Sequence, residues 1–159
     1  FFKQKTAYEI VDCDWSSDVC SSDLEGALDE RVAALGLDGH VRRIGYVHGE
    51  SALRDLYAAA RVFAFPSLYE GFGLPVAEAM ACGTPVLTGD VTALPEVAGG
   101  AAVLVDPRSS GSIADGLARL LDDEALRARC RAAGLARAAE LTWEAAADRL
   151  VGEIGRAHV

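Results

Sequence analysis

The chain has 159 residues, of which 51% are hydrophobic and 25% charged, so it can form one domain with a single sizeable core. Its 15 basic and 24 acidic side chains give a formal net charge of −9, which disfavours nucleic-acid binding through a basic surface. The sequence has neither an apolar run long enough to span a membrane nor the pattern of a signal peptide. We therefore expect no membrane span and a cytoplasmic location.

The two ends of the chain are related through their possible coding DNA. Residues 18–23 can be encoded by a DNA stretch whose reverse complement encodes Ile-Gly-Arg-Ala-His-Val, the sequence of residues 154–159. One oligonucleotide ligated to both ends of a DNA insert produces this relationship; an inverted repeat in the gene is the alternative. Residues 25–153 contain arginine but no lysine, whereas both lysines lie near the N-terminus. We predict an adapter-derived leader (1–24), a partial native domain (25–153) and an adapter-derived tail (154–159).

Strands and helices alternate along the predicted native domain. Short β-branched runs bounded by Gly, Pro, Ser or Asp predict four strands, at residues 40–44, 61–65, 85–88 and 101–105. Apolar residues at helical spacing predict a helix capped by Ser51, a helix over 75–81, one with Ile113, Leu117, Leu120 and Leu121 on its inner face, and one after Thr142. In the last of these, Trp143 is expected to pack against the sheet.

The order of these elements predicts the fold class. Nearly continuous apolar strands separated by single helices indicate a parallel sheet with helices on both faces, which is an α/β fold. Ligands of such sheets bind beyond the carboxyl ends of the strands, here the loops after Phe65, Thr88 and Val105. Cys82 and Cys130 have no metal-ligand spacing around them, so we interpret both as small core residues and predict no metal site.

The strongest chemical signal is FPSLYEGFGLPVAEAMACGTP, residues 65–85, which passes from a predicted strand through a glycine loop into a helix. Gly71 and Gly73 permit close approach of the backbone, and the first amides of the helix, near Gly73 and Leu74, favour an anion such as phosphate. Glu78 can accept two hydrogen bonds from a vicinal diol such as a ribose. By spacing alone, Glu70 is better explained as a turn residue and Glu78 as a solvated residue on a helix face. The intervening GFGLP favours the functional interpretation instead.

The two glutamates have the E-x7-E spacing within LYEGFGLPVAEAMACGTPV. With LYAAARVFAFPS and LPEVAGGAAVLVDP, this segment resembles the C-terminal, donor-binding half of group 1 (family 4) retaining glycosyltransferases, which have two Rossmann-like domains (GT-B type). The resemblance implies a Rossmann-like domain truncated at its N-terminal side. It also implies hexosyl transfer from a nucleoside-diphosphate sugar to a hydroxyl acceptor with retention of the anomeric configuration, without a metal or other cofactor.

The resemblance further assigns roles to single residues. Glu70 would be the catalytic residue that orients the donor sugar, Glu78 would bind the ribose, and the backbone near Gly73 the diphosphate. The acceptor would be bound by the missing N-terminal domain, so we do not expect the chain alone to transfer sugar. The donor-binding residues implied in this way are Tyr46, Val47, Gly71, Phe72, Gly73, Leu74 and Glu78. Arg42 and Arg43 do not match the basic pair of the family, and we predict that they are solvated charges at the edge of a strand.

Three alternatives remain open. Gly71 and Gly73 with Asp90 are partly consistent with an NAD-binding Rossmann unit, but Val76 occupies the position of its third glycine. The chain is also consistent with a nucleotide-binding fragment without catalysis, or with part of a sugar-nucleotide epimerase of the same architecture. His48 is predicted to be an ordinary loop residue, and Asp106 a turn residue at the end of a strand.

Overall fold

The computed structural model describes residues 22–42, 44 and 47–156, and the chain divides into two units, Phe1–His48 and Gly49–Val159. In the first unit, helix α1 (Ser22–Ala34) is followed by two turns at Gly36 and Gly39, whose φ angles are +64° and +81°. The strand predicted at 40–44 is wrong for the described part of that range. The amides of His40 and Val41 both donate to Leu37 O, so a turn takes the donors that a sheet would need.

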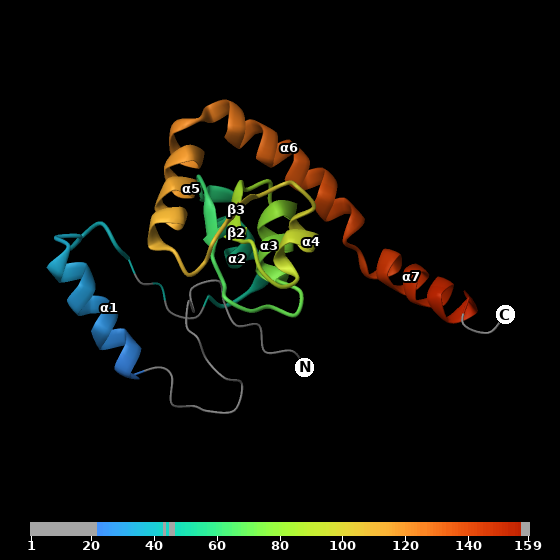
Figure 1. Ribbon diagram of the computed structural model, residues 1–159, viewed down its shortest axis with the longest axis horizontal. Coiled ribbons are helices and arrows are strands. Elements are labelled where there is room, and N and C mark those ends of the chain that lie inside the picture. Colours follow the sequence, from blue (N-terminus) through green and yellow to red (C-terminus); the bar gives the residue numbers. More distant parts are fainter. Residues whose placement is uncertain (1–21, 43, 45–46, 157–159) are drawn as a thin grey trace. The chain divides into compact units, whose positions relative to one another are not determined.

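The second unit is built on a parallel sheet, drawn at the centre of the unit in Figure 1. Strands β1 (Phe63–Phe65), β2 (Val86–Gly89) and β3 (Val103–Val105) lie in the order β1-β2-β3, and all neighbours are parallel. In the register, Ala64 pairs with Leu87 and Leu87 with Val103. The α/β class and the three later predicted strands are therefore confirmed, although β1 and β3 are shorter than predicted.

The described part of the second unit contains six helices, of which α2 precedes the first strand. They are α2 (Glu50–Ala59), α3 (Leu74–Ala81), α4 (Leu94–Ala98), α5 (Ser110–Asp122), α6 (Glu124–Glu140) and α7 (Trp143–Arg156). Helices α4 and α6 were not predicted. The cap predicted at Ser51 is wrong, because α2 already begins after Gly49, whose φ is +91°. Side chains do cap α5 and α6. Ser109 Oγ accepts from the Ser112 amide at the start of α5, and Asp123 Oδ1 accepts from the Leu126 amide at the start of α6.

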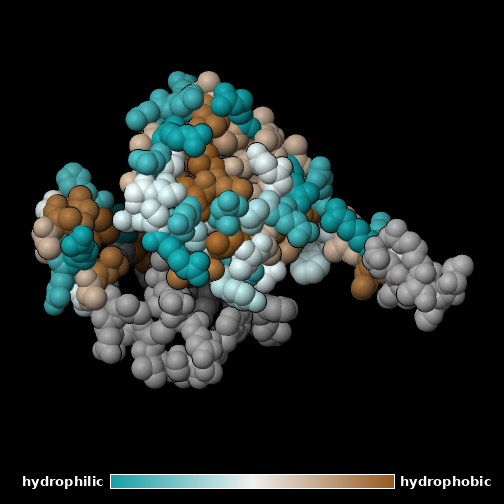
Figure 2. All heavy atoms as spheres, in the orientation of Figure 1, coloured by the Kyte–Doolittle hydropathy of each residue, from teal (hydrophilic) through white to brown (hydrophobic). Residues whose placement is uncertain are grey.

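Helices cover both faces of the sheet, as predicted. Because side chains alternate along a strand, the paired residues Ala64, Leu87 and Val103 share one face. This face forms a buried cluster with Leu120 of α5 and Cys130 of α6. The opposite face is covered by α3, which contacts β1 and β2, and by α4, which contacts β2. Figure 2 shows hydrophobic side chains gathered between α5 and α3, with hydrophilic ones on outer turns of the helices.

The last helix differs from its prediction. Thr142 Oγ1 accepts from the Ala145 amide, so Thr142 does cap α7. Trp143, however, is 83% exposed and does not pack against the sheet; Leu150 and Val151 are exposed as well. An amphipathic period identifies a helix but not the surface that covers it, which explains the error. Helices α1 and α7 cross the predicted boundaries at 24/25 and 153/154; residues 1–21 and 157–159 lie outside the described residues, so the adapter origin stays a prediction.

Arg137 of α6 fixes the end of α4. Its guanidinium donates from Nη2 to Glu96 O (2.8 Å) and from Nε to Val97 O (3.1 Å), and its Nη1 pairs with Glu140 Oε2 at 2.7 Å. We expect Arg137→Met to lower the free energy of unfolding by about 1.5–3 kcal/mol, because two carbonyls lose charged donors. Urea denaturation of the full chain measures this loss. Arg129→Met, at an exposed position of the same helix, is the control, and an equal effect of both changes would contradict the prediction.

Candidate functional site

The loops after the three strands meet at one edge of the sheet. These loops, 66–73, 90–93 and 106–109, all follow carboxyl ends of parallel strands. A Cβ added to Gly89 would lie 2.8 Å from Ser67 O of the first loop and 3.4 Å from Pro107 Cγ of the third. The Asp90 amide also donates to Val105 O (2.8 Å), and Thr88 Oγ1 donates to Phe65 O (2.9 Å). The structure thus brings together the loops in which the sequence placed the chemistry.

Helix α3 begins at this edge, and Gly73 is the residue that turns the chain into it. Gly73 has φ +94° and ψ +51°, a left-handed conformation that favours glycine. Pro75 lies in the first turn of α3, where a missing amide costs no hydrogen bond. The first amides of a helix have no carbonyl partner within it, and the helix dipole is positive there. The start of α3 therefore has the electrostatics of an anion site.

Gly71, in contrast, has open space around it. A Cβ added there would meet nothing within 4 Å, and its φ lies outside the range that favours glycine. Phe72 and Leu74, on either side of Gly73, are 43% and 50% exposed. Internal packing thus explains the glycine at 73 but not the one at 71, where a side chain would project into space that a bound molecule can occupy.

Glu70 is held in the loop before α3. Ser67 Oγ donates to Glu70 Oε1 (3.0 Å), and the Glu70 amide donates to Thr92 Oγ1 (3.2 Å) from the loop after β2. Thr92 has φ +54°, and no other described residue except glycine has a positive φ. Such a conformation is unusual for a β-branched residue. Sequence analysis missed both Ser67 and Thr92; a serine three residues before an acidic residue is too common to have been a usable signal.

Glu78 lies in the second turn of α3 and is half-buried. The hydroxyl of Tyr57, from α2, donates to Glu78 Oε2 (3.2 Å). Cys82 follows Glu78 by one helical turn. Burial raises the pKa of the Cys82 thiol, and nearby Glu78 adds to this effect while Arg54 opposes it. Burial also raises the pKa of Cys130, so both thiols are protonated at neutral pH and neither is suited to be a nucleophile.

The remaining predicted site residues divide between the two units. Val47 is half-buried and His48 exposed in the first unit, where Arg42 is exposed; Tyr46 and Arg43 lie outside the described residues. In the second unit Asp90 is exposed, and Asp106 Oδ1 accepts from the Arg108 amide, which confirms its turn role. The described residues contain no group of three His, Cys, Asp or Glu side chains placed to hold a metal ion. Within the same residues, no helix has the length and apolar character needed to cross a bilayer.

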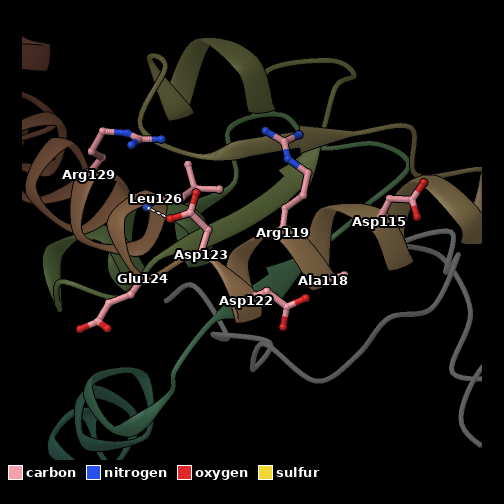
Figure 3. A pocket seen from close by; sticks show the side chains of 8 residues that line it. All are labelled: Asp115, Ala118, Arg119, Asp122, Asp123, Glu124, Leu126 and Arg129. Carbon is pink, nitrogen blue, oxygen red and sulfur yellow. Dashed lines mark hydrogen bonds between the residues drawn. The ribbon is translucent and has the colours of Figure 1, made fainter.

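A shallow pocket lies elsewhere, at the junction of α5 and α6 (Figure 3). Arg119 and Arg129 lie on one side of it, and Asp122 and Glu124 on the other. Its lining contains no residue of loop 66–73 or of α3. Asp123, which also lines it, caps α6 through the Leu126 amide, so this charge pattern belongs to the helix junction. The loops at the carboxyl edge, not this pocket, are the candidate site.

Comparison with known proteins identifies the family. The sequence profile described as glycosyl transferases group 1 matches residues 6–137. The chain belongs to the group 1 glycosyl transferases. Within this family, the chain is 48% identical over 107 residues to O-antigen chain mannosyltransferase B of Escherichia coli, a match that covers 67% of this chain and 28% of that protein.

Two solved structures agree with this membership of the group 1 glycosyl transferases. Sucrose-phosphate synthase from Thermosynechococcus elongatus superposes with a TM-score of 0.70 at 33% identity, over 84% of this chain and 34% of that one. The C-terminal domain of a group 1 family protein from Francisella tularensis superposes with a TM-score of 0.67 at 32% identity, over 75% of this chain and 62% of that one. The chain thus spans about a third or less of the longer relatives it matches.

Proposed function

We propose that this chain binds the nucleoside-diphosphate sugar of a retaining glycosyltransferase of the GT-B type and presents its hexose for transfer to a hydroxyl acceptor. The observation that carries the proposal is the start of α3 at the carboxyl edge of the sheet, with Glu70 just before it and Glu78 in its second turn. This arrangement combines an anion site with two carboxylates, which fits a ligand that has both phosphates and hydroxyl groups.

Each part of the donor has a proposed partner. The amides at Gly73 and Leu74 meet the diphosphate, and the positive end of α3 stabilises the charge that grows on it as the sugar departs. Exposed Phe72 and the open space at Gly71 leave room for the phosphates. Glu78 accepts hydrogen bonds from the ribose hydroxyls, and Glu70, fixed by Ser67, accepts them from the sugar. The base-binding role of Tyr46 and Val47, which belong to the first unit, stays a prediction from the sequence.

The acceptor site is proposed to lie in the part of the relatives that this chain does not match. Positioning of the acceptor against the donor carbon can supply roughly 7–11 kcal/mol of catalysis in favourable cases. The matched relatives include a mannosyltransferase and a sucrose-phosphate synthase, which supports a nucleotide sugar as donor and leaves its sugar and base open. The cytoplasmic location stays a prediction from the sequence.

The division of roles between the two glutamates is testable by binding alone. We expect Glu78→Ala to weaken binding of a nucleoside diphosphate by about 1–3 kcal/mol, because ribose hydroxyls lose their acceptor. Glu70→Gln is expected to leave that affinity unchanged and to weaken binding of the matching nucleotide sugar. Isothermal titration of the full chain with UDP, GDP and ADP, and with UDP-, GDP- and ADP-glucose, measures both effects.

NAD⁺ and Glu96→Ala are the controls for this experiment. Glu96 is exposed in α4 and lies outside the proposed site, so its change should leave all affinities as they are. Tighter binding of NAD⁺ than of every nucleoside diphosphate would favour the dinucleotide-binding alternative. Equal losses of nucleoside-diphosphate affinity in Glu78→Ala and Glu70→Gln would show that the division of roles is wrong.

A further inference from the structure

Tyr57 connects α2 to the proposed ribose-binding residue. Its side chain is buried, with 4% of its surface exposed, yet its hydroxyl donates to Glu78 Oε2 at 3.2 Å. Tyr57 and Glu78 lie on different helices, and α2 contacts α3. A buried phenol usually needs a hydrogen-bond partner, and here that partner is the carboxylate proposed to bind the ribose of the nucleotide sugar.

Tyr57 is itself fixed at both its ring and its backbone. The ring stands edge-on to Phe63 of β1, with centroids 5.1 Å apart and an interplanar angle of 89°. Its carbonyl accepts from Thr84 Oγ1 at 2.6 Å, and Thr84 is almost fully buried between α3 and β2. The hydroxyl of Tyr57 can therefore move only if the packing against β1 or the bond to Thr84 changes.

A hydrogen-bond donor in a fixed position can orient a glutamate carboxylate, because the glutamate side chain has three rotatable bonds. Glu78 is half-buried, and a side chain of this length has several staggered rotamers. The Tyr57 hydroxyl favours the rotamers that keep Oε2 within hydrogen-bond distance. A carboxylate that is already oriented loses less conformational entropy when a vicinal diol binds, which strengthens binding without any new contact to the ligand.

We infer that Tyr57 is a positioning residue that orients Glu78 for the ribose of the donor. This inference rests on the proposed function, because it assigns Tyr57 a role only through the ligand of Glu78. The competing explanation is that the hydrogen bond simply ties α2 to α3. The two differ in what they predict for the ribose hydroxyls: orientation of Glu78 affects recognition of the diol, whereas a structural tie does not.

The test is Tyr57→Phe, which keeps the ring against Phe63 and removes only the hydroxyl. Titration of the full chain with UDP, GDP and ADP identifies the diphosphate that binds the wild type best, and its 2′-deoxy form is the second probe. We expect Tyr57→Phe to weaken binding of the ribonucleotide about five- to tenfold, the effect of one hydrogen bond. We also expect the preference for ribose over deoxyribose to fall towards one. Near-ultraviolet circular dichroism checks that the variant is folded.

A double-mutant cycle and a matched control complete the experiment. In a Glu78→Ala background, Tyr57→Phe should have no further effect on affinity, because its role passes through the carboxylate. Trp143→Phe, at an aromatic side chain of α7 that is 83% exposed and lies outside the proposed site, should change neither affinity nor ribose preference. One outcome is that the wild type binds a nucleoside diphosphate, Glu78→Ala lowers that affinity, and Tyr57→Phe keeps the wild-type affinity and ribose preference. In that case the positioning role is overturned and the proposed function stands. If no diphosphate binds the wild type, both are overturned.

Discussion

Replacing Gly73 with alanine will lower the free energy of unfolding by about 2–6 kcal/mol. Two costs combine at this residue. An L-residue at φ +94° is strained by roughly 1–3 kcal/mol, and overpacking typically costs another 1–3 kcal/mol. The added Cβ would lie 2.7 Å from Leu94 Cδ2, and the fully buried Leu94 has little room to move. A loss of this size is a large part of the stability of an ordinary domain.

Gly71→Ala is the matched control, in the same loop. Its Cβ would meet nothing within 4 Å, and its backbone conformation suits any residue, so the free energy of unfolding should change by less than about 0.5 kcal/mol. If phosphates occupy the space beside Gly71, the affinity for nucleoside diphosphate should nevertheless fall. Urea denaturation and titration of both variants separate folding from binding. Equal stability of Gly73→Ala and the wild type would contradict the role assigned to Gly73.

Gly116→Ala, in the helix that covers the face of the sheet opposite α3, will lower the free energy of unfolding by about 2 kcal/mol. Helix α5 lies so close to the strands here that a Cβ would approach Val105 Cγ1 to 2.6 Å and Leu87 Cδ1 to 2.8 Å. Both contacted side chains are buried, so neither can turn into solvent. Alanine favours a helix over glycine by about 1 kcal/mol, but overpacking a dense core costs up to about 3 kcal/mol. The packing cost is therefore the larger effect.

Gly111→Ala in the same helix should change the free energy of unfolding in the opposite direction. The nearest atom to its added Cβ is Ser109 Oγ at 3.8 Å, an ordinary contact. Without overpacking, only the helix preference remains, and the free energy of unfolding should rise by about 0.5–1 kcal/mol. Thermal denaturation of the two variants side by side measures the difference. A stabilising Gly116→Ala would show that α5 can move away from β2 and β3 at little cost.

The interactions that hold the two glutamates could not be predicted from the sequence. Glu70 and Glu78 were identifiable because a glycine loop leading into a helix is a local pattern. Their partners Thr92 and Tyr57 lie 22 and 21 residues away, and no spacing rule links them. The left-handed conformation of Thr92 was equally unpredictable, because a threonine gives no sign of it in the sequence.

By itself, the sequence determined the α/β class, the three strands of the sheet and the position of the loop between β1 and α3. Hydrophobic periodicity, glycine and proline are local signals, and these features depend mainly on them. The tertiary structure decided which apolar segments are covered. It left Trp143 exposed, formed a turn at His40 and Val41 instead of a strand, and placed Tyr57 beside Glu78. Burial and hydrogen bonding between distant residues depend on how the elements pack, which local pattern does not encode.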